Sequence, residues 1–336
     1  MANPPVKVAV VGVGHVGAFH AQIYRRLSPA AELVAVYDTN HQRANEIAHS
    51  TGARALTDLR ELPGLVSAVS VCVPTSRHYE VAKPLLEAGL HVLIEKPITT
   101  NLKDADALLA SAARHKRTLQ VGHIERFNAA IQAAQSYLTH PRFIEAHRLS
   151  AYPGRGTDVS VVLDVMIHDL DMVLALVGSH PSRVDAVGIP VLSTSEDLAN
   201  ARLAFPSGCV ANLTASRVSD ESLRRIRVFQ EDAYLSIDYK AQTVDLVRLR
   251  RGRDRQAEKT TTGIERTSLV VQPKPPLDEQ LAAFIDAVRT GTRPVVSGEE
   301  ARAALALALR IEHAMRRKPA ASSKRQASST QKRNAP

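Results

Sequence analysis

The chain has 336 residues and a formal net charge of +9, enough length for about two domains that each bury a core. Seven of the basic residues lie between Arg316 and Arg333, with no acidic residue after Glu312, so the body is nearly neutral and the high charge does not mark a nucleic-acid-binding fold. Cys72 and Cys209 are the only cysteines, too few for a disulfide framework or a thiolate metal site.

Residues 317–336 consist mainly of Ser, Ala, Gln, Lys and Arg without an apolar period, which predicts a disordered basic tail. The tail has no aromatic residues to stack on bases, so we expect no specific nucleic-acid partner. No apolar run approaches the roughly 18 residues of a membrane span, and no basic leader is seen at the N-terminus. We therefore expect a cytoplasmic protein without a membrane anchor.

The apolar run Val6–Val11 predicts a strand, and the sequence GVGHVG at 12–17 follows it directly, before a predicted helix that includes Tyr24. This GxGxxG pattern allows a tight turn, a close backbone approach to a pyrophosphate and close packing of helix on sheet. The helix N-terminus adds free N–H groups for the phosphates. The predicted cofactor contacts in this motif are Gly12, Gly14, His15, Val16 and Gly17.

A second apolar run, Leu33–Tyr37, ends at Asp38, roughly 20 residues past the glycines, where a carboxylate would bond the ribose hydroxyls. A carboxylate repels a 2′-phosphate, and no arginine follows before Arg43, so the predicted cofactor is NAD rather than NADP. Asp38 could also cap the next helix, and the two roles are compatible.

Short apolar strands then alternate with helices, which predicts a doubly wound parallel Rossmann sheet over residues 1–123. Ligands of such sheets bind at the carboxyl ends of the strands. The residues that follow these strands should therefore line one crevice with the cofactor: Pro74, Thr75, His78, Glu95, Lys96 and Pro97, with His123 nearby. We expect Ser76 to cap the helix that ends at Glu87.

Beyond His123 the pattern predicts an α/β domain at 124–316 with a large open, mostly antiparallel sheet covered by helices on one face. Strand-like segments extend from Arg183 to about Val271, and two helices, Leu277–Arg289 and Glu299–Met315, follow. An uncovered, half-apolar sheet face predicts a homo-oligomer, either a dimer or a tetramer.

The predicted helix Val161–Val177 is apolar on nearly every side, yet it carries Asp164, His168 and Asp171 along one line. A polar stripe on a buried helix requires a partner, either a cleft with a polar ligand or a pairing of Asp164 with His168 in the core. Lys96 favours the cleft, although Glu95 and Lys96 alone would be typical of a surface ion pair. Together these groups supply a base and a cation for hydride transfer from an alcohol, and no metal is expected.

The motifs GVGHVG (12–17), EKP (95–97) and DVMIHD (164–169) together resemble those of the glucose-fructose oxidoreductase, inositol dehydrogenase and MocA-type family. The resemblance extends from Val6 to about Met315. It implies a Rossmann domain followed by an α/β domain with an open sheet, and NAD(P)-dependent oxidation of a sugar or cyclitol hydroxyl. It also implies that Lys96, Asp164 and His168 are catalytic and that the Lys96-Pro97 peptide is cis.

The stretches 121–128, 152–155 and 162–171 resemble a narrower branch that acts on UDP-N-acetylglucosamine. That branch oxidises the 3-hydroxyl to a 3-keto sugar nucleotide for an aminotransferase in lipid A or surface-polysaccharide synthesis. The expected substrate contacts are His123, Arg126, Tyr152, Arg155, Asp164 and His168.

Independently of the resemblance, Arg126, Arg148 and Arg155 are candidates for a diphosphate because a guanidinium fork suits phosphate oxygens. Each of them could instead form an ion pair or lie on a solvated face. The alternative substrate is a free cyclitol or sugar such as myo-inositol or glucose. A remote alternative is an NAD-bound regulator whose tail touches nucleic acid.

Overall fold

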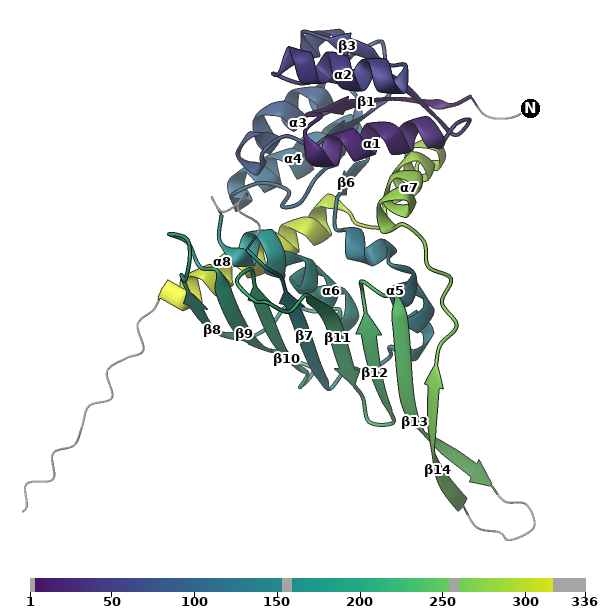
Figure 1. Ribbon diagram of the computed structural model, residues 1–336, viewed down its shortest axis with the longest axis vertical. Coiled ribbons are helices and arrows are strands. Elements are labelled where there is room, and N and C mark those ends of the chain that lie inside the picture. Colours follow the sequence, from purple (N-terminus) through teal and green to yellow (C-terminus); the bar gives the residue numbers. More distant parts are fainter. Residues whose placement is uncertain (1–3, 153–158, 254–259, 317–336) are drawn as a thin grey trace, which may run out of the picture.

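The computed structural model describes residues 4–152, 159–253 and 260–316, and two sheets organise it (Figure 1). The first sheet contains β1 (Val6–Val11), β2 (Ala31–Tyr37), β3 (Arg54–Leu56), β4 (Ala68–Val71), β5 (His91–Ile94) and β6 (Leu119–Val121). Its order is β3-β2-β1-β4-β5-β6, and every pair is parallel. The predicted Rossmann sheet is confirmed.

The helices of this first domain are α1 (His15–Arg26), α2 (His41–Thr51), α3 (His78–Glu87) and α4 (Leu102–His115). Asn40 caps α2 and Asn101 caps α4, each through a side-chain oxygen that accepts a backbone N–H. The predicted cap at Ser76 is wrong, because a 3₁₀ turn at Thr75–Arg77 precedes α3 and no side chain caps that helix.

The second sheet contains β7 (Phe143–Leu149), β8 (Arg183–Ile189), β9 (Leu198–Ala204), β10 (Val210–Ser216), β11 (Leu223–Phe229), β12 (Ala233–Asp238), β13 (Thr243–Arg253) and β14 (Thr260–Ser268). Its order is β14-β13-β12-β11-β7-β10-β9-β8, and β7 with β10 is its parallel pair. Side chains along β7 alternate between buried and half-buried, as expected for a sheet that packs on one face.

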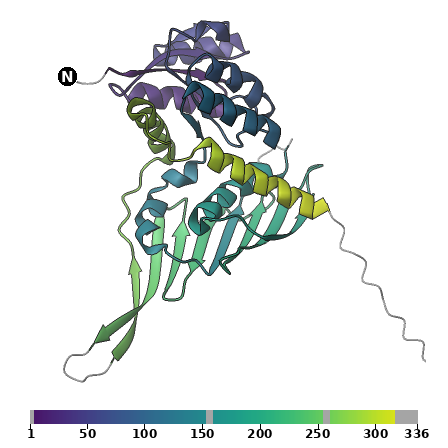
Figure 2. The ribbon, with the colours of Figure 1, turned by 180° about the vertical axis from the view of Figure 1, so that it is seen from behind.

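Helices cover one face of the second sheet, as predicted. They are α5 (Ala129–Ala134), α6 (Ile167–Val177) and α8 (Gly298–Arg316). Figure 2 views the molecule from behind and shows α8, in yellow, in front of the sheet. Helix α5 is flanked by two 3₁₀ turns, at Ile124–Phe127 and at Gln135–Tyr137. None of the described helices is long and apolar enough to cross a bilayer.

Helix α7 (Pro276–Thr290) returns to the first domain and lies beside α1 (Figure 1). Its side chains Leu281, Phe284 and Ile285 share a core with Val8 and Tyr24. The chain then begins α8 with a capping box in which Glu300 accepts the N–H of Ser297 and the Ser297 hydroxyl accepts the N–H of Glu300. The chain therefore crosses between the domains more than once, whereas the sequence suggested a single boundary after residue 123.

The single helix expected over Val161–Val177 has two parts. A π-helical turn at Val162–Met166 precedes α6. π turns occur mostly as single turns within α-helices and are frequent at functional sites. Because this turn holds Asp164, the straight line of three polar residues predicted from α-helical spacing is not formed.

Candidate active site

The glycine loop between β1 and α1 has the shape that a pyrophosphate requires. Gly12 has φ +83°, and a Cβ there would lie 2.8 Å from the backbone carbonyl of Cys72. A Cβ on Gly17 would lie 1.8 Å from the carbonyl oxygen of Gly12, whereas a Cβ on Gly14 would meet nothing within 4 Å. Helix α1 has no side-chain cap and no acidic residue in its first turn. A dinucleotide diphosphate therefore fits at this helix N-terminus, beside His15 and Val16.

The carboxylate of Asp38 joins the end of β2 to the glycine loop. Its Oδ2 accepts from the N–H of Val13 at 2.8 Å, and its Oδ1 accepts from the N–H of Asn40 at 2.9 Å. Asn40, not Asp38, caps α2. Arg43 donates from Nε to the carbonyl of Val13 at 3.1 Å, so a guanidinium lies beside the same loop.

We expect Asp38 to set the preference for NAD⁺. Wild-type protein should show the higher kcat/KM with NAD⁺, and D38S should shift the ratio towards NADP⁺ by about tenfold, since about 1.4 kcal/mol of charge repulsion is removed. Initial rates with both cofactors measure this ratio. E87Q, which removes an exposed carboxylate paired with Lys83 on α3, is the control and should leave the ratio unchanged. A wild-type preference for NADP⁺ would contradict the assignment.

Glu95 follows β5 and faces into the fold rather than forming a surface pair. The Nε2 atom of buried His20 lies 3.2 Å from its Oε1, and a Cβ on Gly122 would come within 2.6 Å of that same oxygen. Burial by itself would raise the pKa of Glu95, but the His20 contact and the charge of Lys96 outweigh burial and lower it. A carboxylate is therefore held beneath the predicted crevice.

The imidazole of His78 connects the two loops that line this crevice. Its ring nitrogens lie 2.9 Å from the carbonyl oxygen of Pro97 and 2.9 Å from that of Val73, and the ring is buried. Pro74 and Thr75 lie in the turn between Val73 and His78. The Lys96-Pro97 peptide is cis, as the family resemblance implied.

Lys96 and Asp164 meet across the junction of the two domains. The Nζ atom of Lys96 donates to the Asp164 carbonyl oxygen at 2.6 Å and to its Oδ1 at 3.0 Å. The π turn directs this carbonyl towards Lys96, and Asp164 is engaged by the ammonium group rather than by His168. The alternative of a core pair between Asp164 and His168 is therefore not favoured.

His168 and His123 lie edge to face, with ring centroids 6.2 Å apart. Within the described residues, both ring nitrogens of His123 and the Nδ1 atom of His168 lack a hydrogen-bond partner. Burial lowers the pKa of both imidazoles, and the charges of Lys96 and Arg148 lower that of His168 further. Both rings are therefore neutral at pH 7, and buried nitrogens without a protein partner are suited to a polar ligand or water.

The pH dependence of kcat/KM should report His168 if this imidazole is the base. Only the neutral ring accepts a proton, and because its folded-state pKa is lowered, the neutral form persists well below the ordinary histidine pKa of about 6.5. Activity should therefore stay level from pH 7 downward and fall only at a distinctly lower pH. An acid limb at pH 6.5 or above would contradict this expectation.

Two of the predicted phosphate contacts are paired with carboxylates. Arg126 donates to Asp171 at 2.7 Å, and its guanidinium lies 3.5 Å from Glu300. Arg148 is buried between Asp169 and Glu125, with contacts of 2.8 to 3.0 Å. The structure thus favours the ion-pair alternative for Arg148.

The remaining substrate candidates are Tyr152 and Arg155. Tyr152 is exposed at the end of the first described range, and Arg155 lies outside the described residues. Sequence reasoning missed the acidic partners Glu125 and Asp169, which hold the buried guanidinium of Arg148. The sequence signal for these partners was the alternating pattern of β7, which places Arg148 on the buried face of the strand. A buried guanidinium requires carboxylates nearby.

Both halves of the chain match known domains. Residues 6–123 match an oxidoreductase family with an NAD-binding Rossmann fold, and residues 129–236 match the GFO/IDH/MocA C-terminal domain. The UDP-N-acetylglucosamine 3-dehydrogenase of Acidithiobacillus ferrooxidans is 37% identical over 92% of this chain and 97% of its own length. A solved structure of that enzyme superposes with a TM-score of 0.85 at 36% identity, again covering 92% and 97% of the two chains.

A second relative acts on a different class of substrate. The myo-inositol 2-dehydrogenase of Thermotoga maritima is 28% identical, covering 90% of this chain and 94% of its own length. Similarity to dehydrogenases of both kinds agrees with a site that removes hydride from a secondary alcohol.

Proposed function

This chain belongs to the GFO/IDH/MocA family of NAD-binding oxidoreductases, and we propose that it oxidises the 3-hydroxyl of UDP-N-acetylglucosamine to a 3-keto sugar nucleotide. The observation that carries the proposal is the Lys96-Asp164 contact across the domain junction, beside the neutral imidazole of His168. The choice of a nucleotide sugar is supported by the similarity to the Acidithiobacillus enzyme.

When bound, NAD⁺ would supply the hydride acceptor. His168 accepts the hydroxyl proton as the C–H hydride departs, so that the secondary alcohol becomes a ketone. The Lys96 ammonium stabilises the negative charge that develops on the oxygen. Asp164 holds this ammonium in place through its carbonyl and carboxylate oxygens.

Further residues of the proposal hold the substrate. His123 offers two unpaired ring nitrogens beside His168, which suits a sugar hydroxyl or amide. Arg126, Tyr152 and Arg155 are proposed as contacts to the rest of the nucleotide sugar. For Arg126 the support is that its side chain stays 15% exposed although it pairs with Asp171.

The test is NADH formation by the purified protein with NAD⁺, comparing UDP-N-acetylglucosamine, myo-inositol and glucose. A 3-keto-trapping aminotransferase should be present, because the oxidation runs uphill. We expect turnover with the nucleotide sugar and none with myo-inositol or glucose. Turnover with a free polyol alone would replace the proposed substrate by a cyclitol or sugar, while Lys96, Asp164 and His168 would keep their roles.

The product implies a place in a reaction sequence. A 3-keto sugar nucleotide is the substrate that an aminotransferase requires, and we propose that this step serves lipid A or surface-polysaccharide synthesis in the cytoplasm. Detection of the 3-amino sugar nucleotide after adding the aminotransferase and an amino donor would support it, and accumulation of free ketone alone would not.

We also propose a homo-oligomer, either a dimer or a tetramer. The face of the second sheet that the helices leave open carries exposed apolar side chains at Val187, Ile189, Phe229 and Leu249. A sheet face with exposed apolar side chains is usually buried against a partner, and a copy of the chain is the simplest one. Sedimentation of the purified protein measures the assembly, and a monomer would overturn this proposal.

A further inference from the structure

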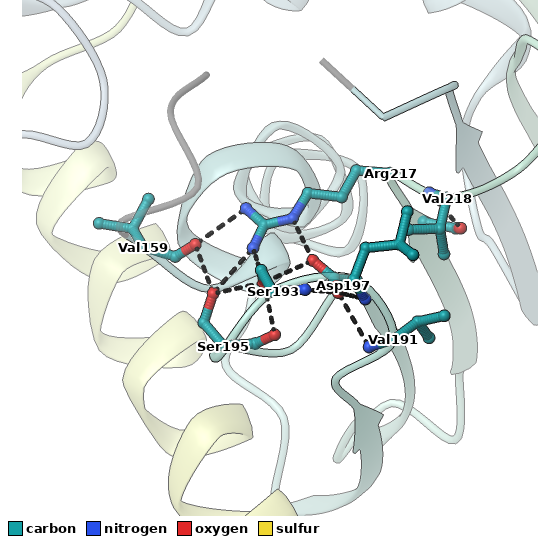
Figure 3. Close-up of polar contacts among 9 residues, drawn as sticks. Val159, Val191, Ser193, Ser195, Asp197, Arg217 and Val218 are labelled. Atoms are coloured by element: carbon teal, nitrogen blue, oxygen red, sulfur yellow. Dashed lines mark hydrogen bonds and ion pairs between the residues drawn. The ribbon is translucent and has the colours of Figure 1, made fainter. Parts of the chain in front are cut away.

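The side chain of Arg217, at the end of β10, is the largest fully buried side chain among the described residues, with 1% of its surface exposed. Its Nε donates to Oδ1 of Asp197 at 2.8 Å, and its backbone N–H donates to the Asp197 carbonyl at 2.9 Å. Asp197 is itself fully buried. Figure 3 shows this pair at the centre of a set of polar contacts.

Asp197 also fixes the turn between β8 and β9. Its Oδ2 accepts the consecutive N–H groups of Val191, Leu192 and Ser193 at 2.7 to 2.9 Å. The hydroxyl of Ser193 donates to Oδ1 at 2.7 Å. These donors occupy both carboxylate oxygens, so the carboxylate is held in one orientation (Figure 3).

The guanidinium of Arg217 extends this arrangement to the segment that leads into the π turn. Its Nη1 donates to the carbonyl oxygen of Val159 at 2.9 Å. Its Nη2 donates to the hydroxyl of Ser195 at 2.8 Å, and that hydroxyl donates in turn to the Val159 carbonyl at 3.3 Å. One planar group therefore fixes a turn and a backbone carbonyl together, as the fork geometry of arginine allows.

Two further backbone contacts carry this restraint to the catalytic segment. Val161 donates its N–H to the carbonyl of Glu196 at 2.9 Å, and Asp164 donates its N–H to the carbonyl of Ser160 at 3.1 Å. Asp164 is thus connected to Arg217 through only a few residues. Buried ion pairs contribute little net stability compared with apolar packing, so stability alone gives little reason for this one.

We propose that Arg217 is a positioning residue, which fixes the backbone at Val159 so that the π turn presents Asp164 to Lys96 and His168 to the substrate. This inference rests on the proposed function, since it assigns the purpose of the positioning. It predicts that Arg217 affects the hydride-transfer step far more than cofactor binding, because NAD is held by the first domain.

The test compares R217K with wild type. Lysine keeps the charge beside Asp197 but cannot reach Val159 and Ser195 together. We expect kcat to fall about 10- to 10²-fold, the loss that a displacement of about 1 Å causes, while the Kd for NADH stays within about twofold. Rates are expressed per NADH-binding site, so that unfolded protein in the sample does not lower the measured kcat. R227K, which alters an ion pair with Glu145 on the same sheet away from this segment, is the control and should behave like wild type.

A second readout does not depend on turnover. Amide hydrogen exchange over residues 160–168 should be faster in R217K, with exchange in the first domain unchanged. If R217K does not fold, S195A removes one hydroxyl of the set and should lower kcat about two- to tenfold with the same local exchange effect.

Unchanged kcat per NADH site together with unchanged exchange over 160–168, even with a lowered Tm, would overturn the inference. A wild-type protein that oxidises none of the tested alcohols would instead count against the proposed function. The exchange comparison would still decide whether Arg217 fixes the catalytic segment.

Discussion

Replacing His168 by asparagine is expected to lower kcat by about 10²-fold or more, with only a modest change in the Kd for NADH. The imidazole is neutral because of its burial and the nearby Lys96 charge, and a positioned base of this kind typically contributes 10²- to 10⁴-fold to a rate. Asparagine keeps the approximate size and polarity but cannot accept the proton. Steady-state kinetics with NAD⁺ and the active substrate, together with NADH titration, measure both quantities.

The control for this prediction is H147N, because His147 lies on β7 with its side chain towards the open face of the sheet, opposite in parity to buried Ala146 and Arg148. That variant should keep wild-type kcat. If H168N also keeps its kcat, the proton is accepted elsewhere, and Lys96 becomes the next candidate. K96M would then show the larger loss, and the acid limb of the pH profile would no longer depend on His168.

The first domain could be predicted from sequence nearly residue by residue because its signals are local. The glycine turn, the apolar strands and the intervening helices each follow from a short stretch, and β1 has its predicted bounds, Val6–Val11. Helix α7 shows the limit of this reasoning. Its apolar face predicts burial, but only tertiary contact shows that the first domain provides the partner.

The active site was predictable where a motif fixes the position of a side chain on an element. Lys96 at the end of a parallel strand and Asp164 on a buried helix were expected in one crevice, and they are in contact. The π turn was not predictable, since nothing in its sequence distinguishes a π turn from an α-helical one and the widening depends on surrounding contacts. Arg217 and Asp197 were missed because each lies one residue outside a strand, where strand parity no longer assigns a side chain to one face.

The pairing of Arg148 had a local signal that reasoning from residue type overlooked. On β7, Ile144 and Ala146 are buried, and the period of two places Arg148 on the same inward face. A buried guanidinium requires carboxylates, and Glu125 and Asp169 supply them. Strand parity therefore predicts an ion pair where the affinity of arginine for phosphate suggested a substrate contact.

Replacing Arg148 by methionine is expected to destabilise the fold by about 3–5 kcal/mol, because the carboxylates of Glu125 and Asp169 would stay buried without a counter-charge. The contact between this guanidinium and the ring of Tyr239, 5.2 Å from its centroid, would also be lost. A fall in Tm of about 6–20 °C follows from that free energy for domains of this size. Thermal unfolding at pH 7 with and without NADH measures the change.

The matched control is R302M. Arg302 also forms a two-pronged pair, with Asp106 at 2.7 and 3.1 Å, and it differs from Arg148 mainly in being exposed to solvent. Since exposed pairs contribute little to stability, R302M should leave Tm almost unchanged, and the difference between the two variants isolates the effect of burial. If R148M instead raised the KM for the nucleotide sugar and left Tm unchanged, Arg148 would return to the substrate site as a phosphate contact. Equal falls in Tm for both variants would show that burial of the pair is not what makes Arg148 necessary.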